Sequence, residues 1–127
     1  MEFDWKLPED TVGGVTFSLV FIQERKLRLR ITGSGRIPGR DSPQPWLDYR
    51  RQITEVWIDE GITEVGNRAF YADPLLERIW LPGSLCSIGE NAFTACPKLE
   101  EIYYCGTPEQ LRQVEIPSGA LPEWFSL

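Results

Sequence analysis

An internal repeat of 23 residues is the feature of this sequence that most restricts its fold. Ile53, Leu76 and Leu99 are spaced at this interval. The same interval joins Val56/Ile79/Ile102, Ile58/Leu81/Tyr104, Ile62/Leu85, Val65/Ile88, Gly66/Gly89, Ala69/Ala92, Phe70/Phe93 and Pro74/Pro97. A unit with two short strand-like stretches and a compact corner is too small to bury its own apolar face. The repeat therefore predicts a solenoid, in which each unit packs against its neighbours.

The repeated positions indicate how such a solenoid is filled. Residues that recur at alternate strand positions are expected to point inward and to form apolar columns. Gly66 and Gly89 fit a tight corner, because glycine adopts backbone conformations that other residues avoid. Phe70 and Phe93 are expected to plug the interior of the coil.

These units resemble a known repeat family. The strings ITEVWIDEGITEVGNRAF, LERIWLPGSLCSIGENAFTACPKLEEI and YYCGTPEQL are similar to the BspA-like (Treponema-type) leucine-rich repeat, L-x-x-I-x-L-P-x-x-L-x-x-I-G-x-x-A-F-x-x-C. The resemblance covers residues 27–116, and Asp73 stands where Cys96 supplies the cysteine of the next unit. It implies a non-enzymatic protein of the secreted or surface-exposed kind, with a role in adhesion and host-protein binding.

We therefore expect a β-rich leucine-rich-repeat solenoid, a short right-handed superhelix with a parallel sheet, an N-terminal β-hairpin cap and a C-terminal helical cap. Residues 1–127 would form a single domain. Its parts would be a hairpin cap and connector (1–52), the repeats (53–106) and a C-terminal cap (107–127).

The two predicted caps rest on local sequence signals. Residues 15–21 and 26–31 have strand character and are close enough for a hairpin. Trp46 and Tyr49 are expected to plug the open end of the core. Thr107-Pro108-Glu109-Gln110 is a capping-box sequence, which predicts a helix over 108–114. Three apolar residues are expected to fold back over that helix: Leu121, Trp124 and Phe125.

Composition excludes several classes of function. The chain has 13 basic and 19 acidic residues, a net charge of −6, so nucleic acid is not expected as a partner. No apolar run approaches the ~20 residues of a membrane span, so membrane insertion is not expected. The start of the sequence has no signal-peptide pattern and, as written, favours the cytoplasm, whereas the family resemblance implies secretion or the cell surface.

Enzyme chemistry finds little support in the sequence. Histidine is absent, which removes the commonest general base and metal ligand. Cys86, Cys96 and Cys105 match no zinc spacing, and we expect reduced cysteines that pack in the structure. Asp59 and Glu60 are adjacent and so point to opposite sides of a strand. We therefore expect no catalytic residues, no bound metal and no cofactor.

The candidate binding site is the outward face of the repeated strands. Its predicted members, at positions that alternate with the apolar columns or lie beside them, are Trp57, Trp80, Tyr103, Glu55, Arg78, Glu101 and Asp59. Rigid aromatic side chains are enriched at binding hot spots, and Arg28 and Arg30 could extend the face. The alternative interpretation is that the rings cover the sheet or lie beneath the caps.

The sequence therefore predicts an adhesion or scaffold-type module that binds a protein through this face. The partner would be a host protein or a second copy of the chain, the latter giving a homodimer. The alternative is a carbohydrate-binding module, in which a glycan stacks on the aromatic residues; a sugar site would need a groove with unpaired polar groups.

Overall fold

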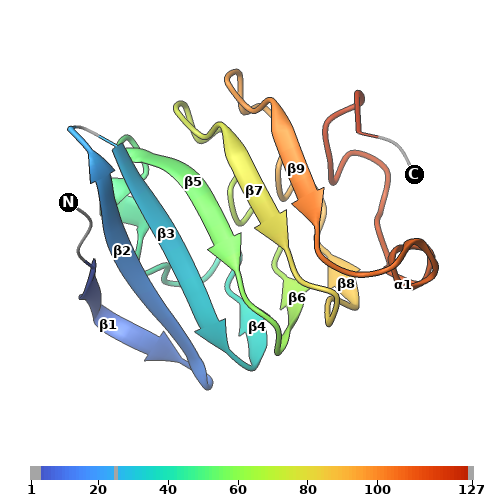
Figure 1. Cartoon of the computed structure of the whole chain (residues 1–127), viewed down its shortest axis with the longest axis horizontal. Coiled ribbons are helices and arrows are strands. Elements are labelled where there is room, and N and C mark those ends of the chain that lie inside the picture. The colour runs from blue at the N-terminus through green and yellow to red at the C-terminus, as the bar shows by residue number, and fades with distance from the viewer. Residues whose placement is uncertain (1–3, 25, 126–127) are drawn as a thin grey trace.

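The chain forms a short β-solenoid with strands on two sides (Figure 1). The structure is a computed structural model that describes residues 4–24 and 26–125, with side chains from residue 13 onward. The front sheet has six strands in the order β1-β2-β3-β5-β7-β9, and the back sheet has three in the order β4-β6-β8. The front strands are β1 (Asp4–Val12), β2 (Val15–Gln23), β3 (Lys26–Gly33), β5 (Ile53–Ile58), β7 (Arg78–Leu81) and β9 (Glu101–Tyr104). The back strands are β4 (Gly35–Ile37), β6 (Ile62–Val65) and β8 (Ser87–Ile88).

The 23-residue repeat sets the register of the parallel strands. Val56 pairs with Ile79, which pairs with Ile102, so equivalent positions of successive units lie side by side. β3, β5, β7 and β9 run parallel, and so do β4, β6 and β8. The chain thus makes about three turns, and the predicted solenoid with a parallel sheet is confirmed.

Aromatic rings form a continuous stack through the core. Phe17, Trp46, Phe70 and Phe93 are each completely buried, and successive ring centroids lie 5.2, 5.2 and 5.3 Å apart. The prediction that Phe70 and Phe93 plug the coil is confirmed. Trp46 was expected at the open end of the core, but it lies between Phe17 and Phe70. A 3-10 turn, η1 (Leu47–Tyr49), follows it, and Tyr49 is partly buried against the core.

The corner glycines are required by close packing between coils. A Cβ on Gly66 would lie 2.4 Å from the Gly39 nitrogen, and one on Gly89 would lie 2.5 Å from the Asn67 nitrogen. Neither glycine has a positive φ; the left-handed residues of these corners are Arg68 and Asn91, at φ of 56° and 55°. The prediction that Gly66 and Gly89 lie at the corner is correct. Glycine is required there because the coils are too close for a side chain, and not because of a left-handed backbone.

The N-terminal strands pair as an antiparallel unit beside β3. β2 and β3 form the hairpin that the sequence predicts at 15–21 and 26–31, although each strand is longer. β1 pairs with β2 and was not predicted. Its register shifts between Lys6 and Thr11, on either side of Pro8. Because proline lacks a backbone N–H, it obscures a strand pattern and is confined to edge strands or bulges.

The predicted C-terminal helix forms and contacts the core through one side chain. α1 (Pro108–Arg112) begins with the full capping box, in which Thr107 and Gln110 each accept the other's backbone N–H. No residue of α1 is fully buried, but Leu111 is partly buried and packs against the core.

The segment after α1 stacks on the last complete corner. Glu115 forms a parallel bridge with Ser87, and the Phe93 N–H donates to the Ala120 carbonyl. Leu121 is partly buried against the core, whereas Trp124 is 53% exposed. The prediction that Trp124 folds back is therefore wrong.

One corner buries an ionisable side chain. Asp73 is 1% exposed, and its Oδ1 lies 3.6 Å from Arg40 Nη2 and 3.7 Å from Arg50 Nη1. Burial raises the pKa of Asp73 to about 7, against the opposing effect of the two arginines. Cys96, at the equivalent position of the next unit, donates its thiol to the Phe70 carbonyl, and burial raises its pKa to about 11.

The three cysteines are free thiols, as expected, but differ in their surroundings. Cys96 is partly buried and packs against the core. Cys86 and Cys105 are exposed, so the prediction of a packing role is wrong for these two.

We expect Gly89→Ala to lower the free energy of unfolding by about 1–3 kcal/mol, because the added methyl overlaps the neighbouring coil. Chemical denaturation measures this loss. Gly83→Ala is the control, since its nearest contact would be the Gly106 Cα at 3.2 Å. Equal effects of the two substitutions would contradict the close-packing role of Gly89.

Asp73→Asn is expected to change how stability depends on pH. The folded pKa of Asp73, about 7, is above the ordinary value of 3.8, so the folded state holds this proton more tightly than the unfolded state. Stability from this group is therefore present at low pH and declines as pH rises toward 7. Between pH 5 and pH 8 the wild type should lose about 2–3 kcal/mol more than Asp73→Asn. Urea unfolding at both pH values tests this, and parallel pH profiles would refute it.

Candidate binding face

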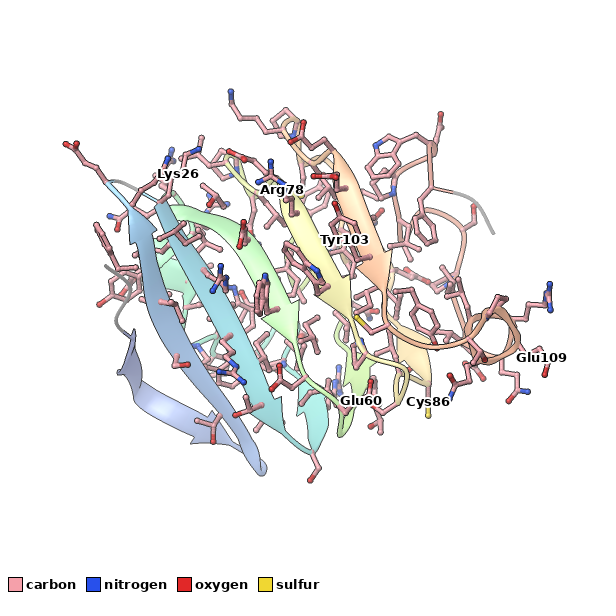
Figure 2. The ribbon with its side chains drawn as sticks, in the orientation of Figure 1. Lys26, Glu60, Arg78, Cys86, Tyr103 and Glu109 are labelled. Atoms are coloured by element: carbon pink, nitrogen blue, oxygen red, sulfur yellow. The ribbon has the colours of Figure 1, made fainter. Side chains whose placement is uncertain are left out.

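The outward positions of β5, β7 and β9 bring six of the predicted site residues together. Trp57 pairs with Trp80, which pairs with Tyr103. One position to the N-terminal side of the inward residues, Glu55 pairs with Arg78, which pairs with Glu101. Figure 2 shows Arg78 and Tyr103 on the neighbouring strands β7 and β9. Asp59, the seventh residue, follows β5 directly.

The aromatic ladder (Trp57, Trp80 and Tyr103) is a row of rings in contact. The centroids of Trp57 and Trp80 lie 5.0 Å apart, as do those of Trp80 and Tyr103. The Arg28 guanidinium lies over Trp57 at 3.8 Å from the ring centroid. Trp57 and Trp80 are therefore flanked on both sides, whereas Tyr103 ends the row and is 40% exposed.

The charge ladder (Arg28, Glu55, Arg78 and Glu101) runs beside the rings. Arg28 Nε lies 3.0 Å from Glu55 Oε1, and Arg78 bridges Glu55 at 3.7 Å and Glu101 at 2.7 Å. The predicted extension by Arg28 and Arg30 is present, because Arg30 pairs with Asp59 at 3.2 Å. The sheet face thus carries charges that are largely paired within the face itself.

Tyr103 and Glu101 connect the two ladders. The Tyr103 hydroxyl donates a hydrogen bond to Glu101 Oε2. This bond, together with Arg78, lowers the pKa of Glu101, and the same bond raises the pKa of Tyr103. Glu101 is therefore held in its ionised form at the edge of the face.

A hollow of about 430 Å³ lies at the C-terminal ends of β5 and β7. Trp57, Asp59, Trp80 and Cys105 are among its lining residues. The Trp57 indole N–H is buried without a hydrogen-bond partner among the described residues, a cost that proteins usually avoid. The Asp59 carboxylate is engaged by Arg30.

The buried Asp73 corner was not identified from the sequence as a site. The signal for it was the departure from the repeat, since aspartate stands where the next unit has Cys96. Within residues 4–24 and 26–125, no three acidic or cysteine side chains gather as metal ligands would. Among the same residues, no helix has the length and apolar character that a membrane crossing requires.

We expect Arg78→Gln to destabilise the protein at low salt, because it leaves the Glu55, Glu77, Glu100 and Glu101 carboxylates without their shared cation. Added salt should reduce the difference in stability between Arg78→Gln and wild type. Thermal unfolding at two ionic strengths measures it, with Lys98→Gln at an exposed position as the control. A loss independent of salt would contradict an electrostatic role.

Comparison with known proteins identifies a related repeat family. A family model described as "BspA type Leucine rich repeat region (6 copies)" matches residues 48–118. A search of curated proteins found no matching sequence.

Solved structures provide a second comparison. A leucine-rich repeat protein from Eubacterium ventriosum aligns with a TM-score of 0.63 and 21% identity, over 91% of this chain and 28% of that one. A leucine rich cell surface protein from Faecalibacterium prausnitzii aligns with a TM-score of 0.41 and 20% identity, over 94% of this chain and 38% of that one. The chain therefore spans less than half the length of either protein.

The first of these structures supports the solenoid fold. The family model covers more than half of the sequence and coincides with the coils described above. The chain belongs to the BspA-type leucine-rich repeat family.

Proposed function

We propose that this protein is a non-enzymatic module, of the adhesion or scaffold type, that binds a protein through the outer face of its front sheet. The observation that carries the proposal is the aromatic ladder beside the charge ladder on strands β5, β7 and β9. Contiguous rings held rigidly on a sheet lose little entropy on binding. Solenoids also commonly bind through their extended surfaces. A role at a bacterial surface is part of the proposal, since the family resemblance implies it.

The arrangement of the rings favours a protein over a glycan. A sugar that stacks on an aromatic residue needs a free ring face. Trp57 lies between Arg28 and Trp80, and Trp80 lies between Trp57 and Tyr103. Arg28 therefore covers one face of Trp57, and Tyr103 stacks on one face of Trp80. The paired charges also favour a protein partner, whose side chains can exchange with these ion pairs at the rim.

A carbohydrate-binding module is the second candidate. The hollow near Trp57 and Trp80 combines aromatic walls with the unpartnered indole N–H of Trp57. A hydroxyl group could accept a hydrogen bond from that N–H after a small movement of the ring. This candidate would use the same residues as the first.

We also propose that the β2–β3 hairpin caps the N-terminal end of the core. Complete burial of Val15, Phe17 and Leu19 on β2 supports this role. At the opposite end, Leu111 of α1 is partly buried and packs against the core, so the helix gives partial cover there.

The face is tested by comparing wild type with Trp57→Ala/Trp80→Ala on protein arrays and glycan arrays. We expect protein ligands whose binding falls at least tenfold in the double variant, a change of about 1.4 kcal/mol. Solution mass measured on the same samples shows whether the ligand is a second copy. Circular dichroism establishes that the variant is folded.

Arg36→Ala/Glu64→Ala is the matched control, because it removes an exposed ion pair of the back sheet at 3.5 Å. It should leave binding unchanged. Protein binding retained by the folded Trp57→Ala/Trp80→Ala variant would refute use of the face. Binding confined to glycans would favour the second candidate.

A further inference from the structure

The C-terminal end of the solenoid core is only partly covered by the described residues. The inward residues of the last coil are partly buried: Ile102, Tyr104, Ile116 and Leu121. Their counterparts one coil earlier are at most 2% exposed: Ile79, Leu81, Ile88 and Phe93. The same positions therefore lose their cover where the next coil would lie.

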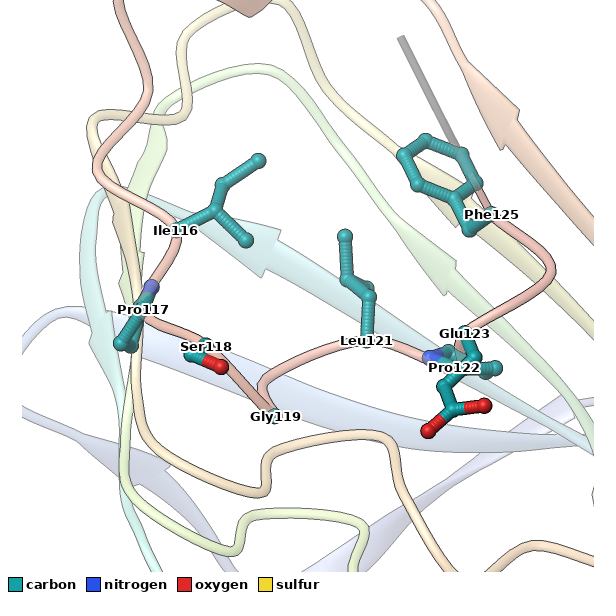
Figure 3. A pocket seen from close by; sticks show the side chains of 8 residues that line it. All are labelled: Ile116, Pro117, Ser118, Gly119, Leu121, Pro122, Glu123 and Phe125. Carbon is teal, nitrogen blue, oxygen red and sulfur yellow. The ribbon is translucent and has the colours of Figure 1, made fainter.

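A hollow in the C-terminal segment is part of this open end. It has a volume of about 470 Å³, and much of its lining is apolar, from Ile116, Leu121, Pro122 and Phe125. Figure 3 shows the Ile116, Leu121 and Phe125 side chains projecting into the same space. An apolar surface of this kind is favourably covered by another apolar surface.

The front sheet also ends in an available strand edge. Among the described residues, β9 has β7 as its one neighbour in the sheet. The Glu101 and Cys105 N–H groups donate toward that side, to the Glu77 and Leu81 carbonyls. Because backbone groups alternate along a strand, those of Ile102 and Tyr104 point to the open side. Such an edge is a template for another strand.

Both ladders indicate which side chains an added strand should carry. The charge ladder alternates in sign from Arg28 to Glu101. A basic residue beside Glu101 on an added strand would therefore continue the alternation. Glu101 is 42% exposed on its side chain, and the neighbouring Glu100 is 58% exposed, which makes this edge acidic. At the other end of the aromatic ladder, Arg28 covers Trp57. The exposed side of Tyr103 can accept an arginine or a ring in the same way.

We propose that this open end binds an extended, basic segment of a protein partner, which adds as a strand along β9. A basic residue would lie beside Glu101 and an arginine or aromatic residue on Tyr103. Aliphatic residues between them would cover Ile102 and Tyr104. The inference rests on the proposed function and names the chemistry of the partner, but it uses the sheet edge instead of Trp57 and Trp80.

The chain itself contains a template for this segment. Lys26–Thr32, with sequence KLRLRIT, lies in β3 and runs parallel to β5. In that pairing Arg28 lies beside Glu55 and Arg30 beside Trp57. The same sequence, aligned on β9, would place its two arginines beside Glu101 and Tyr103. An acetylated, amidated KLRLRIT peptide is therefore the probe.

The test measures binding of fluorescently labelled KLRLRIT to the whole protein by anisotropy. We expect saturable binding that weakens at least tenfold in Glu101→Lys. KLELRIT, in which the first arginine is glutamate, should bind Glu101→Lys better than wild type. Glu90→Lys, with the same charge change at an exposed corner, is the control and should bind KLRLRIT as wild type does. Circular dichroism checks that both variants fold.

Three results would overturn the inference. The first is that the peptide shows no saturable binding to wild type. The second is that Glu101→Lys and Glu90→Lys weaken peptide binding equally. The third is that the wild type is a dimer in solution and must dissociate before the peptide binds. The last would assign this end to a second copy of the chain.

Trp57→Ala/Trp80→Ala separates the edge from the proposed binding face. If folded, this variant should retain peptide binding while losing its array ligands. Loss of the peptide as well would refute a site confined to the edge. Failure of the peptide test with wild-type protein would leave the array result for the face standing.

Discussion

Stacking of one coil on the next is the interaction on which the rest of this structure depends. Each unit is too short to enclose a core, so its apolar side chains are buried by the equivalent side chains of its neighbours. The ring stack of Phe17, Trp46, Phe70 and Phe93 joins the hairpin, the connector and two repeats into one core. Gly66 and Gly89 permit this, because any larger residue would hold the corners apart.

The same stacking creates the surface on which a function can be proposed. Neighbouring strands lie about 4.8 Å apart, close to the 5.0 Å between rings of the aromatic ladder. Because the spacing is similar inside and outside, a repeat selected for its core also aligns its outward residues. On this chain that alignment leaves Trp57 and Trp80 flanked and Tyr103 at the end of the row. The face and its edge therefore differ in what they can contact.

The ends of the solenoid are where the repeat ceases to determine the structure. At the N-terminal end, β2 supplies fully buried residues through an antiparallel hairpin. At the C-terminal end, the segment after α1 reproduces the corner but provides no strand beyond β9 among the described residues. One end therefore buries its apolar positions and the other leaves them partly exposed. This asymmetry underlies the proposed docking of a partner strand.

The sequence by itself determined the repeat, the inward columns, the outward rows and the capped helix at Thr107, because these follow from local periodicity and short-range hydrogen bonding. Tertiary structure alone decided the pairing of β1, the place of Trp46 between two phenylalanines and the burial of Asp73 with Arg40 and Arg50. It also decided that α1 contacts the core through Leu111 without burying any residue fully. These features depend on contacts between segments that do not share the 23-residue interval, and no periodic pattern specifies which distant side chains will meet.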